Sequence, residues 1–192
     1  APSEFLPSPY DSGEQPVVFT GAMDYWPNID AVAWFVQDML PALRARCPGV
    51  CFWIVGRSPS PQVQSLAADD VRVTGTVDDV RPYLQHAAAV VAPLRVARGI
   101  QNKILEAMAM ARPVVASAGC AGVIDAKPGE ELLSATAAED FVDGVAGLIA
   151  DPARAARIGA AARRRVVECY SWEASMSGID RYLQPRASEA AA

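Results

Sequence analysis

Histidine is almost absent from this sequence, whose 192 residues include only His86. A catalytic arrangement of the Ser-His-Asp or Cys-His type would have to use it. His86 stands in PYLQHAAAVV at the entry to an apolar segment, which is typical of a capping or partly buried imidazole. The four cysteines form no Cys-x-x-Cys pair, and with one histidine they do not suit a zinc site. We therefore expect reduced structural thiols and no bound metal.

Long apolar runs and a surplus of basic residues are missing as well. No segment approaches the roughly 18–20 apolar residues that a membrane-spanning helix needs. The first residues lack the basic and apolar regions of a signal peptide. The net charge of −5 and the pI of about 4.9 argue against nucleic-acid binding, although local groups can still bind phosphate. We expect a cytoplasmic protein.

Three common phosphate-site motifs do not occur. The segment FTGAMDYWPN, after the first apolar strand, has no Gly-x-Gly-x-x-Gly, so a dinucleotide-binding fingerprint is excluded. A Walker A loop is also missing. A phospho-receiver domain would need an acidic cluster after the first strand and an aspartate at the end of the third. The chain offers only Asp24 in the first place and Gly75 in the second, which sets that class aside.

The chain divides into a linker, one domain and a short tail. Residues 1–16 hold four prolines and little periodicity, as a linker does, although Phe5, Leu6 and Tyr10 suggest that it lies on a surface. Residues 17–184 form one domain, which is long enough to bury about two thirds of its unfolded surface. The Ala-rich residues 185–192 are expected to be a flexible tail.

Within the domain, short apolar strands alternate with helices. We predict strands at 17–21, 51–56, 71–75, 88–94, 113–117 and 131–135. We predict helices at 28–46, 61–68, from 78 or 79 to 86, around Lys103, and at 138–150, 152–168 and 172–184, with Asn28 as the first N-cap. Such alternation predicts an α/β fold, a Rossmann-like doubly wound parallel sheet of about six strands.

Ligands of such sheets lie at the carboxyl ends of the strands, beside the point where the strand order reverses. The predicted strands end at Gly21, Gly56, Gly75, Pro93 and Ser117. Three of the five are glycines, which suits backbone that approaches a ligand closely. A glycine after a strand can also be a simple turn, and for Gly56 both interpretations stay open.

The segment GIQNKILEAMAMARPVVAS, residues 99–117, is the most informative stretch. Gly99, Lys103 and Glu106 fall at i, i+4 and i+7, so they share one helix face, which starts at a helix N-terminus. An N-terminus favours anions, so the pattern suits a nucleotide, with phosphate near Lys103 and ribose near Glu106. From the spacing alone, a solvated Lys–Glu pair on an ordinary crossover helix is the favoured interpretation.

The residues around this helix carry a family resemblance. Glu106 and the tail Ala107, Met108, Ala109, Pro113, Val114, Val115 and Ala116 match the donor-nucleotide motif of retaining glycosyltransferases with the GT-B fold. The family pattern has a glutamate where Arg98 stands and a glycine at Ala111 or Arg112. The form RGIQNKILEAMAMARPVV resembles a bacterial exopolysaccharide branch associated with the PEP-CTERM system. The resemblance covers roughly residues 17–183.

The resemblance implies a role for each matched position. The chain would be the C-terminal, donor-binding half of a GT-B enzyme, without the N-terminal domain that holds the acceptor. Glu106 would bind ribose hydroxyls and Lys103 the diphosphate. The backbone at the end of the first strand and in the donor loop, residues 99–102, would bind the donor. The nucleotide base would lie against the loop after the third strand. The implied backbone positions are Gly21, Gly75, Thr76, Val77, Gly99, Ile100, Gln101 and Asn102.

The resemblance also implies partners and a setting. The donor would be a UDP- or GDP-linked hexose, transferred with retention to a glycan or lipid-linked acceptor in the bacterial cytoplasm. No further cofactor would be needed, and no Asp-x-Asp pair is present to hold a metal. The full enzyme could associate peripherally with the membrane, while this fragment alone would not turn over. The last helix would cross to the missing domain or form a homodimer contact through one apolar face, which comprises Trp172, Met176, Ile179, Tyr182 and Leu183.

Two departures from the family bear on activity. Many members place an Arg and a Lys after the first strand, where this chain has Asp24 and Asn28. We therefore hypothesise that Arg98, with Arg95, supplies phosphate-binding charge and that Asp24 orients it. Arg98, Lys103 and Glu106 are thus the candidate catalytic residues.

Two other functions remain open from the sequence. Arg98 could mark a non-catalytic module that binds a nucleotide sugar. The chain could also be half of a sugar-nucleotide epimerase with GT-B architecture.

Overall fold

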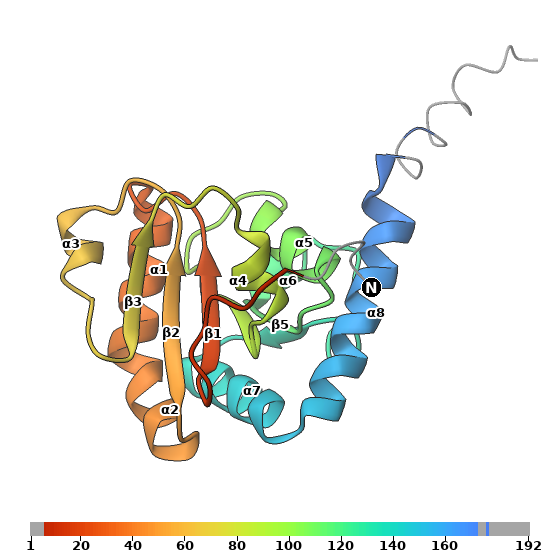
Figure 1. Ribbon diagram of the computed structural model, residues 1–192. Helices are drawn as coiled ribbons and strands as arrows, with labels where there is room; N and C mark the ends of the chain where they lie inside the picture. Colours follow the sequence, from red (N-terminus) through yellow and green to blue (C-terminus); the bar gives the residue numbers. More distant parts are fainter. Residues whose placement is uncertain (1–5, 173–175, 177–192) are drawn as a thin grey trace, which may run out of the picture.

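Six parallel strands form one sheet between two layers of helices (Figure 1). The computed structural model describes residues 6–172 and Met176. The sheet order is β3-β2-β1-β4-β5-β6. The strands are β1 (Gln15–Thr20), β2 (Val50–Val55), β3 (Val71–Gly75), β4 (Ala89–Ala92), β5 (Val114–Ser117) and β6 (Leu133–Ala135). This is the Rossmann order, so the predicted six-stranded α/β fold is confirmed.

Nine helical segments accompany these strands in the described part of the chain. They are α1 (Trp26–Trp34), the π-helical turn η1 (Phe35–Met39), α2 (Leu40–Arg46), α3 (Pro61–Gln64), α4 (Arg81–Gln85), α5 (Asn102–Ala109), α6 (Ala118–Ala121), α7 (Ala138–Ala150) and α8 (Pro152–Tyr170). One face of the sheet carries α1, η1, α2 and α7, and the other carries α4, α5 and α8 (Figure 1). Both faces are therefore covered, which explains why the strands are near-continuous apolar runs.

Aromatic contacts tie the first helical layer to the sheet and to itself. The ring of Phe35 lies 4.3 Å from that of Phe52 in β2, and Trp34 meets Phe141 of α7 edge to face at 5.9 Å. Phe35, Phe52 and Phe141 are fully buried. Pairs with this geometry add about 0.5–1.5 kcal/mol each beyond their buried area. The position of α1 above the ends of β1 and β2 is thus firmly held.

The first predicted helix differs from the structure in two ways. It begins at Trp26, and Asn28 lies within its first turn instead of capping it, because Tyr25 is the N-cap and Pro27 suits the start of a helix. The single helix predicted over 28–46 is also interrupted by η1, where the N–H of Leu40 bonds to the carbonyl of Phe35. Pro41 has no N–H with which to continue the ladder, so the helix rearranges before it.

Other helix boundaries follow the sequence more closely. α7 spans the predicted residues 138–150, and Asp151 caps α8 by accepting from the N–H of Arg154 at 2.8 Å. Neither Asp78 nor Asp79 is the N-cap of α4, whose cap is Val80. Asp79 instead accepts from the N–H of Arg81 at 2.8 Å. The short helix α6 was not predicted, and the helix predicted at 172–184 falls almost wholly outside the described residues.

The N-terminal segment packs on the sheet, as its apolar residues suggested. The Tyr10 hydroxyl donates to the carbonyl of Tyr83 at 2.6 Å, and its ring meets Trp53 of β2 edge to face at 5.1 Å. The N–H of Leu6 donates to the Gln85 side chain at 2.7 Å, and the Leu6 carbonyl lies 2.6 Å from His86 Nε2. His86, the only histidine of the chain, thus contacts the N-terminal segment at Leu6.

Tyr10 is expected to contribute strongly to stability. Replacing it by Ala removes a half-buried ring and its hydrogen bond, which should cost about 3 kcal/mol of unfolding free energy. Tyr10→Phe keeps the ring and loses only the bond, so about 1 kcal/mol is expected. Urea denaturation of the three proteins measures both values. Equal stability of all three would show that the segment does not pack in solution.

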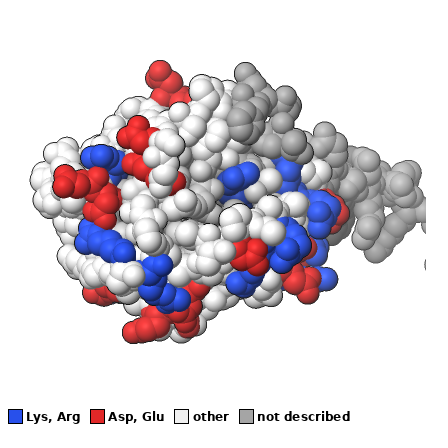
Figure 2. Space-filling model, turned by 60° about the horizontal axis from the view of Figure 1, so that its bottom comes forward, with Lys and Arg blue, Asp and Glu red and all other residues white. Residues whose placement is uncertain are grey.

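Charges are mixed on the face at the amino ends of the strands, where basic and acidic side chains alternate (Figure 2). Arg44 binds Asp70 through two hydrogen bonds of 2.6 and 2.7 Å, and Arg46 of α2 reaches Asp143 of α7 at 2.6 Å. Exposed pairs of this kind contribute little stability individually. No helix within the described residues is both long and apolar enough to cross a membrane.

Candidate functional site

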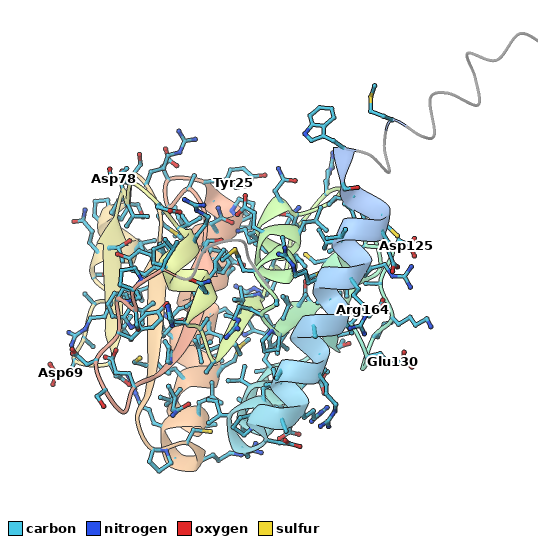
Figure 3. All side chains as sticks on the ribbon, turned by 45° about the vertical axis from the view of Figure 1, so that its right-hand side comes forward. Tyr25, Asp69, Asp78, Asp125, Glu130 and Arg164 are labelled. Atoms are coloured by element: carbon cyan, nitrogen blue, oxygen red, sulfur yellow. The ribbon has the colours of Figure 1, made fainter. Side chains whose placement is uncertain are left out.

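A cleft of about 560 Å³ opens at the carboxyl ends of the strands. Tyr25, after β1, and Asp78, after β3, both lie at this end of the molecule, whereas Asp69, before β3, lies at the other (Figure 3). Eight of the residues predicted to bind the donor line it, namely Gly21, Thr76, Val77, Ile100, Gln101, Asn102, Lys103 and Glu106. Gly75, Gly99 and Arg98 lie outside its lining. The structure therefore brings these eight residues together around one cleft.

The cleft lies at the topological switch point of the sheet. β1 and β4 are neighbours, and the helices that follow them, α1 and α5, lie on opposite faces. An α/β sheet of this order binds its ligands in the crevice that results. The N-terminus of α5 opens into this cleft, where the N–H of Ile104 bonds to the Gln101 carbonyl and the Gln101 side chain caps no N–H of the first turn. Such a helix end favours an anionic ligand.

Two glycines bring the loops after β1 and β2 into contact. A Cβ on Gly56 would lie 1.8 Å from the carbonyl oxygen of Gly21, and Gly56 has a φ of 149°. The N–H of Gly21 donates to Val55 at 3.1 Å, and that of Met23 donates to Arg57 at 2.8 Å. Gly56 is therefore required by the close approach of the Gly21 backbone, a reason that neither interpretation from the sequence included.

Lys103 projects from α5 into the loop after β1. Its ammonium donates to the Asn28 side-chain oxygen at 2.6 Å and lies 3.9 Å from the centre of the Phe19 ring. A Cβ on Gly21 would lie 3.1 Å from that nitrogen, so glycine leaves room for it. Burial lowers the pKa of Lys103 from 10.5 to about 7, against the opposing effects of Cys120 and Glu106. The structure therefore holds a partly desolvated cation in the cleft.

The lowered pKa of Lys103 makes stability depend on pH. The unfolded chain keeps the proton on this lysine up to about pH 10.5, whereas the folded protein releases it near pH 7. Between these values the unfolded state binds more protons, so stability rises with pH. We expect wild type to gain up to about 1 kcal/mol per pH unit relative to Lys103→Met from pH 7 to 9. Urea denaturation at each pH measures this, and a constant difference would contradict a desolvated lysine.

Glu106 lies one turn after Lys103 on the same helix and lines the cleft with an exposed side chain. At the start of α5, the Gln101 side-chain amide donates to the carbonyls of Arg98 and Gly99 at 3.2 and 3.3 Å. This bracing and the left-handed φ of 66° at Gly99 shape the loop that enters α5. Lys103 and Glu106 thus share a helix face at the mouth of the cleft, as predicted, whereas Gly99 does not, because α5 begins only at Asn102.

The arginine hypothesis is corrected in part. Arg95 does not serve the cleft, because it forms a two-point ion pair with Asp30 and stacks 5.2 Å over Trp34. Arg98 is exposed, and no ion pair joins it to Asp24 within the described residues. Asp30 was not considered as a partner because its place in α1 opposite Arg95 depends on tertiary packing. Lys103 is the cation that reaches the loop after β1.

The sequence prediction missed six residues that line the cleft, namely Thr20, Ala22, Val55, Gly56, Arg57 and Val80. Arg57 adds a second positive charge directly after β2. Thr20 is 3 % exposed, and its hydroxyl has no hydrogen-bond partner among the described residues. A buried hydroxyl without a partner is costly. All of the missed residues except Val80 stand at or just after the ends of β1 and β2, which is the sequence signal that could have found them.

Other chemistries find little support in the described residues. All four cysteines are free thiols, and burial raises the pKa of Cys47 and Cys51. No group of three His, Cys, Asp or Glu side chains among the described residues is placed to hold a metal.

The fold is a Rossmann-like α/β domain with a cleft, a lysine and a helix N-terminus at its switch point, of the kind that forms one half of a GT-B enzyme. The family model for glycosyl transferases group 1 matches residues 14–151. The chain therefore belongs to that family. No curated protein matches the sequence significantly.

Solved structures agree with this assignment of the fold. HepE from Anabaena, crystallised with UDP and glucose, is 18% identical with a TM-score of 0.71 over 91% of this chain and 49% of its own. Sucrose-phosphate synthase from Thermosynechococcus elongatus is 26% identical with a TM-score of 0.68, over 89% and 46%. The C-terminal domain of a group 1 glycosyl transferase, LpcC from Francisella tularensis, is 16% identical with a TM-score of 0.66, over 83% and 87%. The chain thus spans about half of the first two proteins.

Proposed function

We propose that this chain is the donor-binding half of a retaining glycosyltransferase that uses a nucleoside-diphosphate hexose. The observation that carries the proposal is the position of the Lys103 ammonium beside Gly21, at the switch point and at the N-terminus of α5. HepE has been crystallised with UDP and with UDP-glucose, which favours a uridine donor over a guanosine one.

Each cleft residue then has a role in the transfer. A hydroxyl oxygen of the acceptor forms a new bond to the anomeric carbon and gives up its proton. The bond between that carbon and the diphosphate oxygen breaks, and the departing diphosphate gains negative charge. Lys103, with the N-terminus of α5, is positioned to offset this charge. Glu106 binds the ribose hydroxyls, and the base lies against Thr76 and Val77. These groups can act without a metal ion.

The acceptor would come from a domain outside this chain. In this proposal a glycan or lipid-linked acceptor binds the N-terminal half of the enzyme. The reaction takes place in the bacterial cytoplasm and serves exopolysaccharide synthesis. The 192 residues alone then bind the donor but do not transfer its sugar. Release of UDP from UDP-hexoses, measured for this chain and for a protein joined to its N-terminal domain, tests this. Transfer by the chain alone, or none by the joined protein with any donor, would contradict it.

Arg98 decides between a transferase and a non-catalytic binder. The family places a glutamate there, and Arg98 is exposed just before the donor loop. If its charge helps to hold the diphosphate, Arg98→Ala in the joined protein should lower the transfer rate about tenfold and Arg98→Glu about 100-fold. Arg157→Glu, an exposed change on α8, is the matched control. Higher activity of Arg98→Glu would show that the natural arginine suppresses transfer, which favours the binder.

A further inference from the structure

Asn28 links the loop after β1 to helix α5 at the candidate site. It lies in the first turn of α1 and is 6 % exposed. Its amide nitrogen donates to the Ala22 carbonyl at 2.9 Å, and its oxygen accepts from Lys103 at 2.6 Å. The side chain therefore binds the loop after β1 with one end and the α5 lysine with the other. A buried amide with both ends bonded has one defined orientation.

Close packing surrounds the lysine head at this contact. A Cβ on Gly21 would lie 2.8 Å from the Asn28 amide nitrogen and 3.1 Å from the Lys103 nitrogen. The Phe19 ring closes the other side at 3.9 Å. Gly21, Asn28 and Phe19 thus form a small socket for the ammonium. This socket explains why β1 is followed by a glycine and why α1 carries an amide at its third residue.

The neutrality of Asn28 has a consequence for charge. A carboxylate at this position would form a partly buried ion pair with Lys103 and cancel its charge. The amide holds the same nitrogen without cancelling it. The positive charge therefore stays available to an anion that enters the cleft.

We infer that Asn28 is a positioning residue, which holds Lys103 at Gly21 and keeps its charge free for the diphosphate of the donor. This inference rests on the proposed function, because it assigns Lys103 to the diphosphate. It adds a residue of α1 to a site otherwise built from strand ends and α5.

Other charged groups around Lys103 must be taken into account. Glu106 on α5 and the Cys120 thiol of α6 are the titratable groups whose charges act on it, and Arg57 after β2 lines the same cleft. Asn28 of α1 and Phe19 of β1 complete the surroundings without a charge. Glu106 and Arg57 are unchanged in all Asn28 variants, so differences between variants report on the contact itself.

The test is UDP affinity by calorimetry at pH 7, 8 and 9, where its phosphates stay ionised. In wild type, affinity should fall by up to about tenfold per pH unit as Lys103 loses its proton. Asn28→Asp should bind about 10- to 30-fold more weakly at pH 7 and show no fall, because the new carboxylate keeps Lys103 charged and competes for it. Asn28→Ala should lose about tenfold at pH 7 and keep the fall.

Controls separate positioning from a general effect. Gln37→Glu, exposed on η1, adds the same charge and should leave the affinity and its pH dependence unchanged. Uridine binding, followed by ligand-observed NMR, should be equal in all variants, since the proposed place of the base is against Thr76 and Val77, away from Asn28. A loss of uridine binding would instead indicate a damaged fold and overturn the inference for that variant. Asn28→Asp is the decisive variant, because its side chain is close in shape to that of wild type.

The outcomes for the inference and for the proposed function differ. If wild type binds UDP and Asn28→Asp shows the same affinity and the same pH dependence, Asn28 does not position Lys103, although the proposed function stands. If neither UDP nor GDP binds wild type, the proposed function fails and the inference fails with it.

Discussion

Lys103→Met is expected to lower UDP affinity about 100-fold, or roughly 2.7 kcal/mol, at pH 7. The variant keeps the aliphatic length and packing against Phe19 but removes the only ammonium beside Gly21 within the described residues. Stability should change by no more than about 1 kcal/mol, since relief of the desolvated charge offsets the bond lost at Asn28. Calorimetric titration and urea denaturation measure the two effects separately.

Lys127→Met is the matched control for this prediction. Lys127 is the only other lysine in the chain and is exposed, with Glu130 at 4.0 Å. Its replacement should leave UDP affinity within about twofold of wild type. Unchanged affinity in Lys103→Met would remove this lysine from the diphosphate site.

Gly56→Ala is expected to destabilise the protein by at least about 3–5 kcal/mol or to prevent folding. The added Cβ would lie 1.8 Å from the Gly21 carbonyl oxygen, which is backbone and cannot rotate away. The φ of 149° adds strain for any side chain. The loops after β1 and β2 would have to separate, and the floor of the cleft would open.

Thermal and urea denaturation of Gly56→Ala measure this cost, with Gly119→Ala as the control. A Cβ at Gly119 in α6 meets nothing within 4 Å, so that variant should be within about 1 kcal/mol of wild type. A Gly56→Ala protein of normal stability that still binds UDP would show that the two loops are not in contact.

The fold could be predicted from the sequence because each strand is a compact apolar run between turn residues. VRVTG became β3 without a change of boundary, and the helix at 138–150 was also placed correctly. Parallel strands buried on both faces have this local signature. The helix interruption at η1 was missed, because it results from Pro41 acting on the turn before it.

The candidate cleft was predictable where its residues follow strand ends or share a helix face. Gly21 and Thr76 follow strand ends, and Lys103 and Glu106 share a helix face. Asn28 could not be predicted in this way, because its contact with Lys103 joins residues 75 positions apart, and its local pattern suggested a helix cap. No sequence pattern indicated Arg57 as a site residue, apart from its place after Gly56.

The departure from the family pattern near the end of α5 has a structural explanation. Ala111 adopts a left-handed conformation with a φ of 57°, so it occupies the place where a glycine is usual. A Cβ on Gly159 of α8 would lie 2.1 Å from the Ala111 carbonyl oxygen. Glycine is therefore needed on the facing helix, while Ala111 accepts some backbone strain.

Calorimetric titration of the wild-type domain with UDP, UMP and uridine, and with the guanosine series, tests the central claim most directly. If the cleft binds a nucleoside diphosphate through Lys103 and the start of α5, one diphosphate should bind at one site per chain. Its affinity should then fall stepwise as each phosphate is removed. A nucleoside that binds as tightly as its diphosphate, or no binding by either series, would contradict the account.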